Sequence, residues 1–380
     1  DVAAGQSVGS PAEFKKVVHF TQNGALRTDI PPLPEASRPV PLIGRGEVPL
    51  EITVAADDTG TIRLQDAALL PGGQCLVALG ESGLRLLSRD GRTVAHFDQP
   101  AHRLVLSDEG NHAIALAPRG DLWRLARLDL ATRRATRWRE AVIHAFPDSY
   151  DGSLWLVALP DSFAAIDATS EEFQTLWRTP EVPGNAVAVN RSSSRASLLL
   201  RSQGKSDLWG HPADAGYQWN RWSFTLPDLV LRDRGEISLS PAIPAVPDLV
   251  SPPPPLLSAS GRIAESVAQD GAVLLHLHPT HGNERLGTAS TTLQGEGPLS
   301  GTLSDTWAFA VTRVPGGVCG HLIHADSARL CARVTLAGAE QVSARLTTDT
   351  LVLADDRGRL LAVSLTDGRL LRNLRVTETA

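Results

Sequence analysis

A unit of about 40 residues recurs along this chain, and this period constrains the fold more than any other feature. Each unit contains a turn, a short apolar run, a second turn and another short run. The units begin at Gly73, Gly110, Gly152, Ser193, Gly271, Asp305 and Asp349. Their separations are 37, 42, 41, 78, 34 and 44 residues, and we take the 78 as two periods because a Pro-rich stretch falls within it.

The apolar runs have the length of strands and not of helices. Residues 76–79, 113–116 and 154–157 are typical, with Gly, Asp, Asn or Ser in the turns around them. A helix would show a stripe with a period of 3.6 residues over roughly ten or more positions. The sequence therefore predicts an all-β chain.

A period near 40 with about four short strands per unit is typical of a β-propeller. One four-stranded sheet cannot bury both of its faces, and stacking such sheets around an axis buries each face against a neighbour. We predict a single β-propeller with seven four-stranded blades. Six and eight blades stay open, because residues 228–240 could form a degenerate blade. A pair of β-sandwiches is the alternative, but it predicts no fixed period.

Two Pro-rich stretches set the expected domain boundaries. Residues 1–60 are predicted to be an N-terminal arm, and residues 61–380 the propeller. Residues 241–255 include four consecutive prolines and interrupt the repeats. They form either a surface insertion or a polyproline II ligand for an aromatic groove.

Composition excludes several classes of protein. The chain has 380 residues, 36 Lys plus Arg against 42 Asp plus Glu, and a net charge of −6. An acidic chain is not a general binder of nucleic acid or anionic membranes. No apolar run approaches the roughly 18 residues of a membrane span. Cys75, Cys319 and Cys331 are scattered, which argues against a zinc knuckle or a disulfide framework.

The first residues carry no targeting signal that we recognise. Residues 1–11 are small and polar, without a basic region followed by an apolar one. We therefore expect a cytoplasmic protein. An extracytoplasmic binding propeller is the alternative, if a signal peptide precedes Asp1.

The repeats are similar to two kinds of propeller. Residues 128–138 resemble the quinoprotein-type repeat A-x-D-x-x-T-G-x-x-x-W, with Arg133 where that family has Gly, and residues 165–169 and 364–369 are looser versions. We attribute this likeness to blade architecture. Residues 120–134 resemble the bpX-type propellers of bacterial systems that pair a MoxR-type AAA+ ATPase with a von Willebrand factor A protein. That resemblance implies a non-enzymatic scaffold with these two protein partners.

Two histidine groups are candidates for metal binding. His276, His278 and His281 form H-x-H-x-x-H, and on a strand the first two would face the same side. No acidic side chain or cysteine follows them before Glu284, which favours a polar strand face instead. His321 and His324, near Cys319, would lie on opposite faces of a strand.

Basic, aromatic and acidic groups are further candidate sites. The densest basic stretch has two tryptophans within it and comprises Arg124, Arg127, Arg133, Arg134, Arg137 and Arg139, with Trp123 and Trp138. On alternating strands these arginines divide between two faces and a turn, so we expect a solvated blade edge or a surface for an acidic protein, and not a nucleic-acid strip. Trp209, Trp219 and Trp222 suit either an interface or packing between blades. The acidic pairs at 171–172 and 355–356 are expected to be solvated turn residues.

No catalytic motif is present, since the chain lacks G-x-S-x-G, H-E-x-x-H, a P-loop and G-x-G-x-x-G. We therefore predict no catalytic, cofactor or metal residues, and a propeller that acts as a protein-interaction scaffold. The alternative is an enzyme of the lactonase or quinoprotein kind, with a metal or cofactor at the central channel.

Overall fold

The computed structural model describes residues 49–55, 62–107, 110–120, 122–142, 144–147, 154–159, 162–167, 174–178, 185–191, 195–202, 218–225, 230–237, 255–258, 260–269, 271–280, 287–347 and 349–376. All of them belong to one compact unit, Pro41–Ala380. Every regular element among these residues is a β-strand, so the all-β prediction is confirmed. In this part of the chain, no helix is long and apolar enough to cross a membrane.

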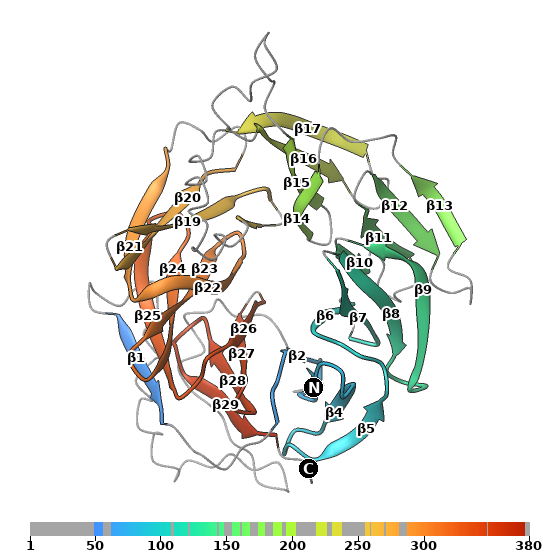
Figure 1. Cartoon of the computed structure of the whole chain (residues 1–380), viewed down its shortest axis with the longest axis horizontal. Coiled ribbons are helices and arrows are strands. Elements are labelled where there is room, and N and C mark those ends of the chain that lie inside the picture. The colour runs from blue at the N-terminus through green and yellow to red at the C-terminus, as the bar shows by residue number, and fades with distance from the viewer. Residues whose placement is uncertain are drawn as a thin grey trace, which may run out of the picture. The chain divides into compact units, whose positions relative to one another are not determined.

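The first four sheets follow one another along the chain, and each has four antiparallel strands in chain order (Figure 1). Sheet 1 contains β2 (Asp66–Leu69), β3 (Cys75–Ala78), β4 (Leu84–Leu87) and β5 (Thr93–Phe97). Sheet 2 contains β6 (Arg103–Leu106), β7 (His112–Arg119), β8 (Leu122–Asp129) and β9 (Arg134–Val142). Sheet 3 contains β10 (His144–Pro147), β11 (Leu154–Ala158), β12 (Phe163–Asp167) and β13 (Gln174–Arg178). Sheet 4 contains β14 (Asn185–Arg191), β15 (Arg195–Ser202), β16 (Gln218–Thr225) and β17 (Val230–Ile237).

Three further sheets complete the series, and one of them has an additional strand. Sheet 5 contains β18 (Leu256–Leu257), β19 (Ile263–Gln269), β20 (Ala272–His278) and β21 (Ala289–Gln294). Sheet 6 contains β22 (Glu296–Leu303), β23 (Trp307–Val314), β24 (Gly317–His324) and β25 (Arg329–Ala337), and β1 (Leu50–Val54) adds to it beside β25. Sheet 7 contains β26 (Val342–Leu346), β27 (Thr350–Asp355), β28 (Arg359–Ser364) and β29 (Leu370–Arg375).

The first strands of the sheets form the inner ring. Contacts join β2 to β6, β6 to β10, β10 to β14, β14 to β18, β18 to β22, β22 to β26 and β26 back to β2. The sheets are therefore arranged around a central axis. The last strand lies at the outer edge of every sheet except sheet 6, where β1 lies outside β25 (Figure 1). This closed arrangement confirms the predicted β-propeller.

The expected number of four-stranded blades is corrected by the topology. Six sheets have four strands, the lower number that the sequence left open, and sheet 6 has five because β1 pairs with β25. Six four-stranded blades are therefore shown, and the expected seventh is not, because the remaining sheet has five strands. Residues 230–237 form β17, the last strand of sheet 4, so they are not a degenerate blade.

One repeat boundary is also wrong. The other expected units begin at the turn between the first and second strands of a sheet. Gly271 instead lies between β19 and β20, the second and third strands of sheet 5. The equivalent turn contains Gly261, ten residues earlier. The long separation is therefore a single step from sheet 4 to sheet 5 and not two periods. Residues 241–254 of the predicted insertion, and all of the predicted arm except residues 49–55, lie outside the described residues.

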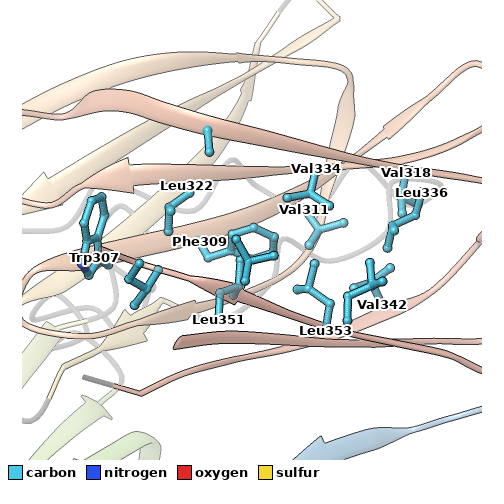
Figure 2. Close-up of a cluster of buried hydrophobic side chains, with 14 of the residues drawn as sticks. Trp307, Phe309, Val311, Val318, Leu322, Val334, Leu336, Val342, Leu351 and Leu353 are labelled. Atoms are coloured by element: carbon cyan, nitrogen blue, oxygen red, sulfur yellow. The ribbon is translucent and has the colours of Figure 1, made fainter. Parts of the chain in front are cut away.

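Apolar side chains fill the spaces between neighbouring sheets. Between sheets 6 and 7, Trp307, Phe309 and Val311 face Leu351 and Leu353 (Figure 2). Burial on both faces explains why these strands read as short continuous apolar runs and not as alternating ones.

Phe309 lies directly over the backbone of sheet 6. A Cβ atom added at Gly320 would lie 2.1 Å from Cζ of the Phe309 ring. The ring is only 1% exposed, so it has no open space into which it can move. Gly320 is therefore required by the packing of this aromatic ring.

Candidate functional site

The H-x-H-x-x-H motif forms a polar face on sheet 5. His276 and His278 lie on the same side of β20, as expected, because the alternating residues Leu275 and Leu277 pack on the opposite side against sheet 6. His276 Nδ1 lies 2.8 Å from the Ser290 hydroxyl.

A carboxylate that the motif did not reveal joins this face from the neighbouring strand β19. Glu265 Oε2 lies 3.4 Å from His278 Nε2, and the Thr288 hydroxyl lies 3.3 Å from His278 Nδ1. His281 lies outside the described residues. Within the described part of the chain, no three His, Cys, Asp or Glu side chains are placed to hold a metal ion.

His321 and His324 lie on opposite faces of β24, which confirms that prediction. His324 packs edge-on against the Trp307 ring, with centroids 5.7 Å apart. His321 is fully buried on the other face. Burial and the neighbouring Arg333 guanidinium lower the pKa of His321 to about 4, so its imidazole is neutral at physiological pH.

The hydrogen bonds around His321 fix its tautomer. The Thr312 hydroxyl lies 2.7 Å from the Gln294 carbonyl oxygen and donates to it. The same hydroxyl oxygen therefore accepts from His321 Nε2, which lies 2.9 Å away. Among the described residues, His321 Nδ1 has no hydrogen-bond partner. These contacts place His321 in the hydrophobic core of the sheet stack.

The arginine-rich stretch divides between two faces and a turn, as expected. Arg137 is paired with Ala126, whose side chain packs toward sheet 1, while Arg127 is paired with Thr136 on the opposite face. Arg133 lies in the turn between β8 and β9 with φ of 58°. This left-handed conformation favours glycine, which is the residue that the quinoprotein-type repeat has there.

The structure describes two of the three clustered tryptophans, Trp219 and Trp222. Trp219 is buried between sheets 4 and 5 with Leu199 and Ile263, which is the packing alternative. Trp222 is half-buried, with its ring centroid 6.3 Å from that of Phe224. Trp209 and the side chain of Trp138 lie outside the described residues.

The acidic pair at 355–356 is not simply solvated, so that expectation is wrong. Asp355 is 1% exposed and accepts a hydrogen bond of 2.5 Å from Nε of Arg359. The same guanidinium donates to the carbonyl oxygens of Ala55 and Ala337, at 2.9 and 2.8 Å. Arg359 therefore joins sheet 7 to the end of β25 and to the residue that follows β1. The pair at 171–172 lies outside the described residues.

An ion pair at the inner ring was missed by sequence reasoning. Asp66, only 5% exposed, accepts from Nη2 of Arg345 at 2.6 Å, from the Ser343 hydroxyl at 2.9 Å and from the Leu104 amide at 2.8 Å. Arg345 also donates to the carbonyl oxygens of Ala67 and Leu104. These groups come from sheets 7, 1 and 2, so the network joins three consecutive sheets. Each of its residues looks unremarkable in the sequence.

The outer edges of the sheets expose apolar side chains. Among the described residues, the exposed large hydrophobic side chains all lie on last strands. They are Val230 (47%) and Leu231 (40%) on β17, and Leu370 (39%) and Leu371 (45%) on β29.

The outer edge of sheet 6 is instead covered by β1, which pairs with β25 in parallel. Ile52 is paired with Val334, and Glu51 with Arg333. The Glu51 carboxylate and Arg333 Nη1 are 2.9 Å apart. We call the outer side of β25 the β25 edge.

No family model and no curated protein sequence matches this chain. Among solved structures, the complex of KlAtg21 with the coiled coil of AgAtg16 is 11% identical, covers 83% of this chain and 100% of its own, and has a TM-score of 0.53. The Myceliophteria thermophila Cps50 (Swd1) β-propeller domain is 12% identical, covers 86% and 100%, and has a TM-score of 0.48. Kuenenia stuttgartiensis hydrazine synthase is 10% identical, covers 95% and 100%, and has a TM-score of 0.49. At these identities the likeness to KlAtg21 shows the fold alone, and it agrees with the β-propeller described above.

Proposed function

We propose that this chain is a scaffold, and not an enzyme, that binds protein partners through the outer edges of its sheets. One observation carries the proposal: the exposed large hydrophobic side chains of the described residues are confined to β17 and β29, both last strands. An edge strand presents unpaired backbone N–H and C=O groups, and proteins usually protect such edges with charges or a covering segment. Apolar side chains on an edge that no other described strand covers indicate a surface that another chain covers.

Sheet 6 supports this proposal because its edge holds a strand. The strands β22 to β25 are connected in the same order as the four strands of the other sheets. We therefore count sheet 6 as a seventh blade, with β1 as an additional fifth strand. The outer edge of sheet 6 thus binds an extended segment, the strand β1 of the same chain.

A MoxR-type ATPase and a von Willebrand factor A protein are the partners that we propose, in a bacterial cytoplasm. The support is the resemblance of residues 120–134 to bpX-type propellers. A propeller of similar fold, KlAtg21, was solved in complex with a coiled coil of another protein. That complex shows a propeller binding a protein segment and does not identify the partner of this chain.

The proposal is tested by co-expressing the full chain with the MoxR-type ATPase and the von Willebrand factor A protein of the same genome. We expect a complex that elutes together in size-exclusion chromatography. We also expect it in the cytoplasmic fraction of the cells and not in the periplasmic fraction. Replacing Leu370 and Leu371 together by Asp should weaken the complex by about tenfold or more, since two apolar contacts are lost. The matched control is Asn373→Asp, an exposed position on the same strand.

Two results would contradict the proposal. One is the absence of a complex with either protein. The other is a complex that tolerates Asp on β29, and also on β17 at Val230 and Leu231, as well as the control does.

A further inference from the structure

β1 is a surplus strand of its sheet. The other six sheets end at their fourth strand, and β22 to β25 already supply four strands to sheet 6. No residue of β1 is buried, whereas four residues of β25 are: Cys331, Ala332, Val334 and Leu336. Removing β1 from the β25 edge therefore leaves a sheet of the same kind as the other six.

The β25 edge recognises a particular pattern of side chains. Leu50, Ile52 and Val54 are paired with Ala332, Val334 and Leu336, and they pack against the cluster between sheets 6 and 7. The positions between them face the other way, where Glu51 and Thr53 are paired with Arg333 and Thr335. An occupant of this edge thus needs apolar residues at alternate positions, an acidic residue opposite Arg333 and a polar residue opposite Thr335.

Extended segments bind sheet edges by a recurring mechanism, in which backbone hydrogen bonds supply affinity and alternate side chains supply specificity. Apart from the hydrogen bond that Arg359 donates to the Ala55 carbonyl oxygen just after β1, the interactions that hold β1 are of modest strength. It is five residues long and parallel to β25, and parallel pairing is slightly weaker than antiparallel pairing. Its ion pair is exposed, with the Glu51 side chain 53% accessible, and exposed pairs contribute little.

We propose that the β25 edge is a strand-docking site occupied by β1, and that an extended segment of a partner protein with this same pattern replaces β1. The proposal rests on the scaffold function, of which it names one binding site and the chemistry of its partner. The advantage of β1 is that it belongs to the same chain, which gives it an effective concentration in the millimolar range. A segment added in trans should therefore bind poorly until β1 is released.

The probe is a fluorescein-labelled peptide with the sequence of residues 49–55, Pro-Leu-Glu-Ile-Thr-Val-Ala. Its binding to the full chain is measured by fluorescence anisotropy. Ile52→Asp places a charge against the apolar cluster and should release β1, so this variant should bind the peptide at least about tenfold more tightly than the wild type. Thr53→Asp adds the same charge at an exposed position and should behave as the wild type does.

Peptide variants test whether binding follows the pattern of β1. Asp in place of Ile at the fourth position of the peptide should abolish binding to the Ile52→Asp chain. Lys in place of the peptide Glu should weaken it severalfold, because Lys would face Arg333.

Two results of these experiments would overturn the proposal. The first is a folded Ile52→Asp chain, shown by circular dichroism, that binds the peptide no better than the wild type does. The second is a concentration-dependent dimer that the peptide dissociates, because the occupant would then be a second copy of this chain.

A measurement on the wild-type chain keeps the proposal testable if Ile52→Asp does not fold. The β1 amide hydrogens that bond to β25 should exchange at least about tenfold faster than those of β24, because β1 opens locally. Equal protection of β1 and β24 would overturn the proposal. None of these results depends on the β29 variants, so failure here is distinguishable from failure of the scaffold function.

Discussion

Acidification should destabilise this protein through one buried imidazole, that of His321. At a pH above about 6.5 the imidazole is neutral in both the folded and the unfolded chain, so it makes no pH-dependent contribution. Below that pH the unfolded chain binds a proton that the folded chain excludes, because burial and Arg333 lower the folded pKa to about 4. Stability is therefore lost as the pH falls from about 6.5 toward about 4, and no further loss from this group follows below that.

The size of the effect follows from the two pKa values. A fall of the His321 pKa from the ordinary value of 6.5 to about 4 corresponds to a maximum loss of about 3 kcal/mol in the free energy of unfolding. By about pH 5 the loss should already reach about 2 kcal/mol, since the unfolded imidazole is then almost fully charged. The physical cause is that protonation would put a second N–H on a ring whose Nδ1 has no acceptor among the described residues.

The assay is urea unfolding, followed by tryptophan fluorescence, at several pH values between about 7.5 and about 4.5. The matched variant is His321→Gln, whose side-chain amide can still donate to the Thr312 hydroxyl but does not titrate. Taking the difference between wild type and variant at each pH removes the contribution of every other titrating group. Between about pH 7.5 and about pH 5, we expect the wild type to lose about 2 kcal/mol more unfolding free energy than the variant does. A difference that stays constant within about 0.5 kcal/mol would refute the reasoning.

Three further predictions concern stability measured by thermal or urea unfolding. Gly320→Ala should destabilise the chain by about 1–3 kcal/mol, because its Cβ would overlap the Phe309 ring. Adding Phe309→Leu should recover part of that loss, and no recovery would contradict the proposed clash. Asp66→Ala should cost about 3–5 kcal/mol, because it leaves the Arg345 guanidinium without its carboxylate. The double variant with Arg345→Met should cost less than the two single changes added together, and strict additivity would argue against the pair. Arg133→Gly should raise stability by up to about 1 kcal/mol by relieving the left-handed backbone, and a clear decrease would show that Arg133 makes contacts that outweigh this strain.

The fold was predictable because propeller sheets are built from local hairpins. Each hairpin has its turn residues and apolar runs close together in sequence, so the period near 40 residues was visible without tertiary information. The error at Gly271 has a local cause as well. The first strand of sheet 5 is only Leu256–Leu257 and follows four prolines, so the sequence shows no apolar run long enough to indicate a strand there. The sequence pattern therefore places the start of this repeat at the next hairpin turn, between β19 and β20.

The turn at Arg133 shows that a repeat pattern predicts backbone conformation but not binding function. The repeat pattern placed glycine at this position, and the backbone there has the positive φ that glycine favours. Such a pattern reports the conformation of a turn. It does not report whether the surface beside that turn binds a quinone or a protein.

The polar networks were not predictable, because their members are far apart in sequence. Asp66 and Arg345 are 279 positions apart, and Glu51 and Arg333 are 282 apart. The alternation of Leu50 to Val54 is that of a strand, but its parallel partner β25 lies nearly 300 residues later. Similarly, Glu265 reaches His278 from another strand, so the H-x-H motif appeared to lack an acid.

The central claim is that protein partners bind the outer edges of the sheets, and hydrogen exchange of the partner complex tests it most directly. The full chain is compared alone and bound to the co-expressed ATPase and von Willebrand factor A protein. We predict that binding slows exchange of the backbone amides of the last strands, foremost β17 and β29. Slowed exchange confined to the first strands around the axis, with β17 and β29 unchanged, would contradict the account.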